Sequence, residues 1–141
     1  MLSWFKDLVA PLRRHDPRLG ALRYLRDARI WEGRTSFRPI GREIELLVRG
    51  EDGGPTAVQR MFFDEVENRY ESLWPTIKKK LAAEALSVGA TAETFELVAV
   101  SVPTEPGERA EWELSYESRP RSWHFTVQME GWRSRDVVAE C

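Results

Sequence analysis

The sequence is poor in the residues that most often build metal and redox centres. Its 141 residues include one cysteine, Cys141, and two histidines, His15 and His124. A single cysteine forms neither an internal disulfide nor a cysteine-based zinc cage, which needs several ligands at close spacing. We therefore predict no metal and no cofactor, and the scarcity of cysteine favours a reducing compartment.

Long apolar runs are also missing. No stretch approaches the roughly 18 consecutive apolar residues of a membrane-spanning helix. The opening residues, MLSWFKDLVAPLRR, lack the apolar run and the small-residue cleavage site of a secretory signal. Glycine-rich nucleotide-binding motifs and nucleophile-elbow motifs are absent as well. These absences predict a cytoplasmic protein without a transmembrane segment.

The sequence is rich in large aromatic residues, and its charges are unevenly distributed. Six tryptophans and six phenylalanines supply bulky core side chains. Residues 1–50 carry eleven Lys and Arg against six Asp and Glu, whereas residues 51–141 carry ten against seventeen. This asymmetry can steer a charged partner, although solvated strand faces whose signs mix after folding are the simpler interpretation.

Residues 56–87 carry the one long helical pattern. Apolar side chains recur there every three or four residues, which places them on one face of a helix. Thr56 is the expected N-cap, and Pro75 interrupts the pattern without shifting its phase. We therefore expect a long helix, kinked at Pro75, that packs on a sheet through Val58, Phe62, Val66, Tyr70, Leu73, Ile77, Leu81 and Ala85.

The rest of the chain alternates apolar and polar residues, as half-buried strands do. The prediction is one α+β domain over residues 20–141, with a six- or seven-stranded, mostly antiparallel sheet in the order βββ-α-βββ(β). One sheet face packs on the helix, and the other is partly solvated, with the short N-terminal helix covering some of it. Residues 13–19 are expected to form a linker. The expected strands begin near residue 20 and cover 29–37, 42–49, 94–102, 110–117 and 122–130, with 132–139 as an optional last strand.

The N-terminal residues 1–12 predict a separate short amphipathic helix. Trp4, Phe5 and Leu8 fall on one side of it, and the basic residues Arg13 and Arg14 follow. So short a helix is marginal alone in water, so it must dock on its own domain, in a partner's groove or on a membrane surface, of which the membrane is the weakest alternative because the polar face has no basic stripe. These five residues are therefore candidate interaction residues. The arginines are too sparse for a nucleic-acid motif, and we predict no nucleic-acid partner.

Two further groups of residues are candidates for a site. Glu113 and His124 fall on outward faces of neighbouring predicted strands, where they suit acid–base chemistry but more often form an exposed cross-strand ion pair. No nucleophile or oxyanion donor accompanies them. Aromatic residues at such spacings are usually core, but they can also line an apolar pocket between helix and sheet. The candidate pocket residues are Trp31, Trp74, Trp112 and Trp123.

One stretch of the chain resembles a known kind of domain. Gly20, Leu22 and Tyr24, then Trp31 and Gly33, then the alternating Ile44, Leu46 and Val48 precede the long helix. Over about residues 19–90 this pattern resembles small bacterial domains of unknown function. The resemblance implies a small α+β protein, of a kind that includes immunity and interaction proteins of bacterial conflict systems, and it implies no catalytic residue.

Three functions follow from these observations as hypotheses. The leading one is a non-enzymatic domain that binds another protein, with an adaptor-like or immunity-like role, and it leaves a homodimer open. The second is a protein that binds a small apolar ligand in a tryptophan-lined pocket. The third, and weakest, is a hydrolase-like enzyme that uses Glu113 and His124.

Overall fold

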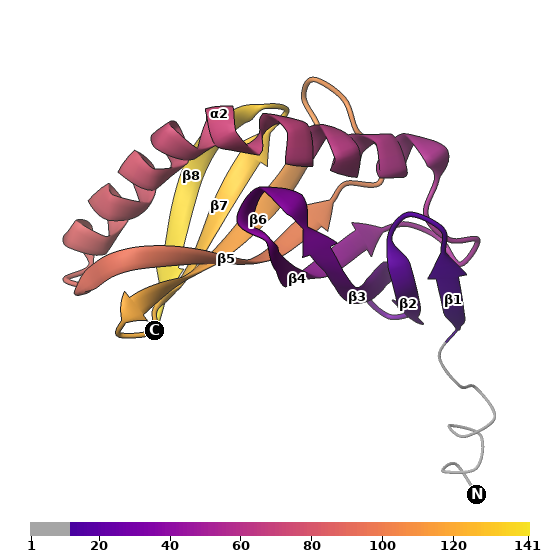
Figure 1. Cartoon of the computed structure of the whole chain (residues 1–141), viewed down its shortest axis with the longest axis horizontal. Helices are drawn as coiled ribbons and strands as arrows, with labels where there is room; N and C mark the ends of the chain where they lie inside the picture. Colours follow the sequence, from indigo (N-terminus) through magenta and orange to yellow (C-terminus); the bar gives the residue numbers. More distant parts are fainter. Residues whose placement is uncertain (1–11) are drawn as a thin grey trace, which may run out of the picture.

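Eight strands join into a single sheet, and their order across the sheet follows their order along the chain. The computed structural model describes residues 12–141 (Figure 1). The strands are β1 (Arg13–Asp16), β2 (Gly20–Leu25), β3 (Ile30–Phe37), β4 (Arg42–Arg49), β5 (Ala92–Val102), β6 (Glu111–Pro120), β7 (His124–Glu130) and β8 (Arg133–Glu140), with a short 3-10 helix η1 (Arg38–Ile40) before β4.

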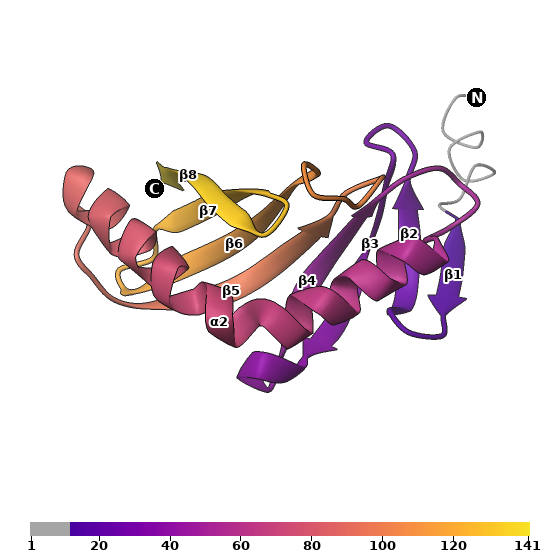
Figure 2. The same cartoon turned by 90° about the horizontal axis from the view of Figure 1, so that it is seen from above.

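The long helix α2 (Ala57–Ser87) joins β4 to β5 and lies against one face of the sheet (Figures 1 and 2). β4 and β5 run parallel, whereas all other neighbouring strands are antiparallel. A parallel pair needs a crossover that returns the chain to the same end of the sheet, and α2 is that crossover. Two four-stranded meanders therefore meet along β4 and β5.

These observations confirm the predicted α+β class, the mostly antiparallel sheet and the single long helix. The predicted strand number was wrong, because the sheet has eight strands instead of six or seven. Residues 132–139, predicted as an optional strand, belong to β8. The predicted helix within residues 1–12 lies almost entirely outside the described residues.

The missed strand is β1, which lies within the predicted linker. It pairs with β2 from Arg13 opposite Arg23 to Asp16 opposite Gly20. Its first three residues are exposed and polar, so it lacks the apolar alternation by which a strand is recognised. Asp16 holds its end in place, because its buried carboxylate accepts hydrogen bonds from the backbone N–H groups of Arg18 and Leu19, at 2.9 Å each.

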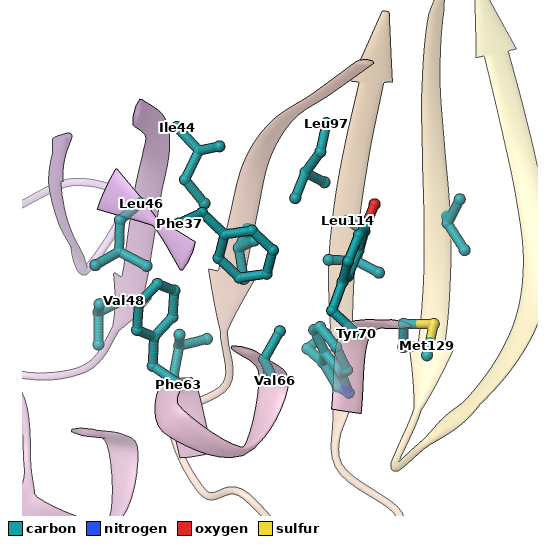
Figure 3. Packing of buried hydrophobic residues seen from close by; sticks show 14 of the residues in the cluster. Phe37, Ile44, Leu46, Val48, Phe63, Val66, Tyr70, Leu97, Leu114 and Met129 are labelled. Atoms are coloured by element: carbon teal, nitrogen blue, oxygen red, sulfur yellow. The ribbon is translucent and has the colours of Figure 1, made fainter. Parts of the chain in front are cut away.

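The core lies between α2 and the covered face of the sheet (Figure 3). The predicted helix stripe differs from the structure at its start: Val58 is 56% exposed, and Phe63 is fully buried instead. A helix of 3.6 residues per turn drifts relative to a regular 3–4 spacing, so the buried stripe moves around it. Strand residues that complete the core include Trp31, Phe37, Ile44, Leu46, Val48, Val100, Leu114, Tyr116, Phe125 and Val127.

The sequence of α2 accounts for its start and for its bend. Thr56 caps the helix and forms a capping box with Gln59, because each side chain bonds to the backbone N–H of the other residue. Pro75 lies inside the helix, whose axis changes direction near its middle (Figures 1 and 2). No helix within residues 12–141 has both the length and the apolar character that crossing a bilayer requires.

Candidate functional site

The sheet face opposite α2 carries no covering element among residues 12–141 (Figure 1). Strand alternation sends every second side chain to this open face. In β4, for example, Ile44 and Leu46 are buried under the helix, whereas Glu43 and Glu45 on the other side are exposed. An antiparallel sheet with one covered and one solvated face follows from this pattern.

Charge is separated along the molecule because the strands follow one another in sequence order. Residues 12–50, which form the β1–β4 end, contain ten arginines against five acidic residues. Residues 88–141, which form the β5–β8 end, contain five arginines against ten acidic residues. The two ends therefore carry formal net charges of +5 and −5, while α2 between them has five basic and five acidic residues. The asymmetry of the sequence thus becomes an asymmetry in space.

A polar hollow of about 430 Å³ interrupts the open face. Strand register brings Ser101, Glu113 and Gln128 side by side on β5, β6 and β7. Arg49 approaches from β4, and its guanidinium lies 3.9 Å from the Glu113 carboxylate. Arg135 of β8 borders the hollow as well. Guanidinium, carboxylate, amide and hydroxyl groups are therefore available to a partner within one small area.

The candidate interaction residues of the N-terminal region divide into two groups. Trp4, Phe5 and Leu8 lie outside the described residues. Arg13 and Arg14 are exposed on β1, the edge strand at the basic end of the sheet. Alternation sends Arg13 to the open face, opposite Arg23, and Arg14 towards the loop before α2, where its guanidinium approaches Gly54.

The proposed pairing of Glu113 with His124 was wrong. His124 lies opposite Glu117, and Glu113 lies opposite Gln128. Four residues of strand separate Glu113 from Glu117, which corresponds to about 13 Å. The sequence identified the correct hairpin but not its register, because β6 continues to Pro120 and the turn lies at residues 121–123 instead of between the predicted strand ends at 117 and 122. The two side chains do not form an acid–base pair.

The four candidate tryptophans do not line one common pocket. Trp31 and Trp112 are buried in the core, and each indole N–H donates to a backbone carbonyl, of Glu51 at 2.8 Å and of Gly131 at 2.7 Å. Trp123 is partly buried against the core beside the β6–β7 turn. Trp74 alone borders a hollow between helix and sheet. The pocket as predicted is therefore corrected to a smaller one at Trp74.

Two tyrosines form the floor of the region beside Trp74. The hydroxyl oxygens of Tyr70 and Tyr116 lie 2.7 Å apart, and the Trp74 ring stacks on both rings. Burial raises the pKa of Tyr70 to about 12, although the hydrogen bond to Tyr116 and the nearby Arg42 guanidinium oppose this shift. Burial also raises the pKa of Tyr116 well above its ordinary value. Both hydroxyls are therefore protonated at neutral pH.

A cluster of ion pairs around two buried carboxylates ties the basic end of the sheet to α2. The carboxylate of Glu67, 1% exposed, accepts hydrogen bonds from Arg18 and from both the backbone and the guanidinium of Arg38. Asp16 pairs in the same way with Arg60 of α2, at 2.9 Å. All these charges have partners within the domain, so the cluster is a structural element.

The described part of the chain contains no group of three or more His, Cys, Asp or Glu side chains arranged to hold a metal ion. Comparison with protein families, with curated proteins and with solved structures found no match to this chain. The evidence for function is therefore the geometry of the open face and of the hollow at Trp74.

Proposed function

We propose that this chain is a non-enzymatic domain that binds another protein through the open face of its sheet. The observation that carries the proposal is the separation of charge between the β1–β4 end and the β5–β8 end. Complementary charge steers two proteins together and fixes their relative orientation. The partner we expect therefore carries an acidic surface at one end of its interface and a basic surface at the other.

The dimensions of the open face suit a protein partner. Eight strands spaced about 4.8 Å apart, with about eight residues each at 3.4 Å, give a face of roughly 38 by 27 Å, or about 1,000 Å². A standard protein–protein interface buries about 800 Å² on each partner. The open face therefore has the area of one complete interface.

The polar hollow supplies the centre of such an interface. Arg49 and Glu113 are about half exposed, and their 3.9 Å separation is long for an ion pair. Each can therefore exchange this contact for a better one with a partner side chain. Well-packed hollows near the middle of an interface hold the few side chains that contribute most of the binding energy.

A second copy of the chain is the alternative partner. A two-fold axis near the boundary between β4 and β5 superimposes the basic end of one copy on the acidic end of the other. Such an isologous contact satisfies the same charges on both sides. Sedimentation of the purified protein in low and high salt distinguishes these two kinds of partner. A dimer that dissociates in high salt indicates a second copy of the chain. A monomer at both salt concentrations indicates that the partner is a different protein.

Site-specific photo-crosslinking tests the proposal. A photoreactive amino acid is introduced at Glu45, exposed on the open face, or at Met61, which is 65% exposed on α2. In cells that express the protein naturally, we expect one specific adduct from Glu45 and none of that mass from Met61. The same adduct from both residues, or from Met61 alone, would contradict binding at the open face.

A further inference from the structure

The hollow beside Trp74 lies on the helix side of the sheet, away from the open face. Its volume is about 280 Å³, and the middle of α2, η1, the start of β4 and the first half of β5 surround it. The apolar side chains in its wall are Pro39, Ile40, Trp74, Phe95 and Leu97. That volume corresponds to about nine water molecules. The hollow therefore fits a molecule with one aromatic ring or a short branched chain.

The tyrosine pair beside this hollow has one hydroxyl proton more than its shared hydrogen bond uses. The pair shares one hydrogen bond, which uses one of its two protons, and the described residues offer neither hydroxyl another acceptor. Tyr116 is fully buried, whereas Tyr70 borders the hollow. A buried proton without an acceptor is costly, which favours the arrangement in which Tyr116 donates to Tyr70. The proton of Tyr70 then remains free for an acceptor in the hollow.

A positive charge lies at the mouth of the same hollow. One Nη of Arg42 donates to Glu96 at 2.8 Å. Glu96 also receives a hydrogen bond from Arg119, at 3.3 Å, so it does not depend on Arg42 alone. A guanidinium has five N–H donors, and the others on Arg42 are free to turn towards the hollow. Glu71 is the one negatively charged residue that lines the hollow, and its side chain is exposed to solvent.

From these contacts we infer that the hollow beside Trp74 binds a small apolar carboxylate. The carboxylate accepts the O–H of Tyr70 and an N–H of Arg42, and the apolar body of the ligand packs on Trp74 and Phe95. Hydrogen bonds to an ionised acceptor are about twice as strong as neutral ones, which favours an acid over an alcohol or an amide. This inference is independent of protein binding at the open face.

The first test compares two probes on the wild-type protein. 3-Phenylpropionate carries the carboxylate, and 3-phenylpropanamide has the same shape without the charge. Each is titrated while the indole N–H signal of Trp74, assigned with Trp74→Phe, is followed by NMR. We expect a saturable shift with the acid and binding of the amide weaker by about tenfold. Absence of saturation up to the solubility limit, or equal affinities for acid and amide, would overturn the inference.

Three pairs of variants then test the residues. Tyr70→Phe and Tyr116→Phe both remove the hydrogen bond between the tyrosines, but only Tyr70→Phe removes the donor to the ligand. Tyr70→Phe alone should therefore weaken binding of 3-phenylpropionate by about tenfold. Arg42→Gln and Arg119→Gln both remove one partner of Glu96, but only Arg42→Gln weakens binding. Glu71→Gln removes a like charge and tightens binding, whereas Glu84→Gln, away from the hollow, does not. Equal effects within either of the first two pairs would overturn the assignment.

Discussion

Replacement of Asp16 by alanine tests whether the segment before β2 is part of the folded domain. The carboxylate of Asp16 accepts three hydrogen bonds of 2.9 Å, from the backbone N–H groups of Arg18 and Leu19 and from the side chain of Arg60. Together they join β1, the β1–β2 turn and α2. If residues 13–19 were only a linker, removal of these three hydrogen bonds would leave the free energy of unfolding unchanged.

The size of the change in the free energy of unfolding follows from the hydrogen bonds that Leu19 and Arg60 lose in Asp16→Ala. Leu19 is fully buried, so its N–H is left without an acceptor, at a cost of about 1–3 kcal/mol. The Arg60 side chain is 29% exposed and keeps a bond to the Pro55 carbonyl, so it returns partly to water. We therefore expect Asp16→Ala to lower the free energy of unfolding by about 3 kcal/mol, and the melting temperature by about 10 °C.

Urea unfolding followed by tryptophan fluorescence measures this free energy directly. Asp27→Ala is the matched control, because Asp27 is exposed in the β2–β3 turn and is expected to change stability by less than about 0.5 kcal/mol. Asp16→Asn keeps one acceptor oxygen and should fall between the two. A loss below about 1 kcal/mol for Asp16→Ala would refute the reasoning, since it is less than one unpaired buried N–H costs.

Four further predictions use other contacts. Gly33→Ala should cost about 2–3 kcal/mol in urea unfolding, because its Cβ would lie 2.4 Å from the Ala21 carbonyl oxygen, whereas Gly53→Ala, with nothing within 4 Å, should be nearly neutral. Thr56→Ala should lose about 1 kcal/mol of stability with the N-cap, and Thr76→Ala, within the helix, should lose less. Burial raises the pKa of the Asp16 carboxyl, but its hydrogen bonds outweigh burial, so the pKa in the folded state lies below 3.8. The stability that Asp16 contributes should therefore be complete above pH 3.8 and be lost as the pH falls through the folded-state pKa. A free energy of unfolding that differs by a constant amount between wild type and Asp16→Asn throughout an acid titration would contradict this. Burial raises the pKa of Tyr70 from 10.0 to about 12, so the folded state holds its proton longer and stability should fall as the pH rises between these values; a slope unchanged in Tyr70→Phe would contradict the assignment.

Local patterns in the sequence were sufficient to predict the helix and most strands. The stripe from Phe62 to Ala85 and the cap at Thr56 are local features, and both are present in the structure. The alternation in β4 and β6 also identified which side chains are buried. Such signals depend on neighbours along the chain, which a single sequence displays.

What the sequence did not reveal depends on contacts between distant residues. β1 is held by Asp16 and Arg60, 44 residues apart, and no alternation marks it. The parallel pairing of β4 with β5, which brings Arg42 close to Glu96, follows from the crossover and not from either strand alone. The hollow at Trp74 combines residues from α2, η1, β4 and β5, so only the assembled fold reveals it.

Charge reversal on the open face tests most directly whether this face binds a protein partner. The most direct measurement compares the affinity of that partner for two charge reversals, Glu113→Lys and Glu65→Lys, at low and at physiological salt. Each glutamate faces one arginine, Arg49 at 3.9 Å and Arg69 at 2.9 Å, but only Glu113 lies on the open face. If the partner binds the open face, Glu113→Lys weakens binding by at least about tenfold, more strongly at low salt, while Glu65→Lys leaves it unchanged. Equal effects of the two substitutions, or an affinity that does not depend on salt, would contradict binding at the open face.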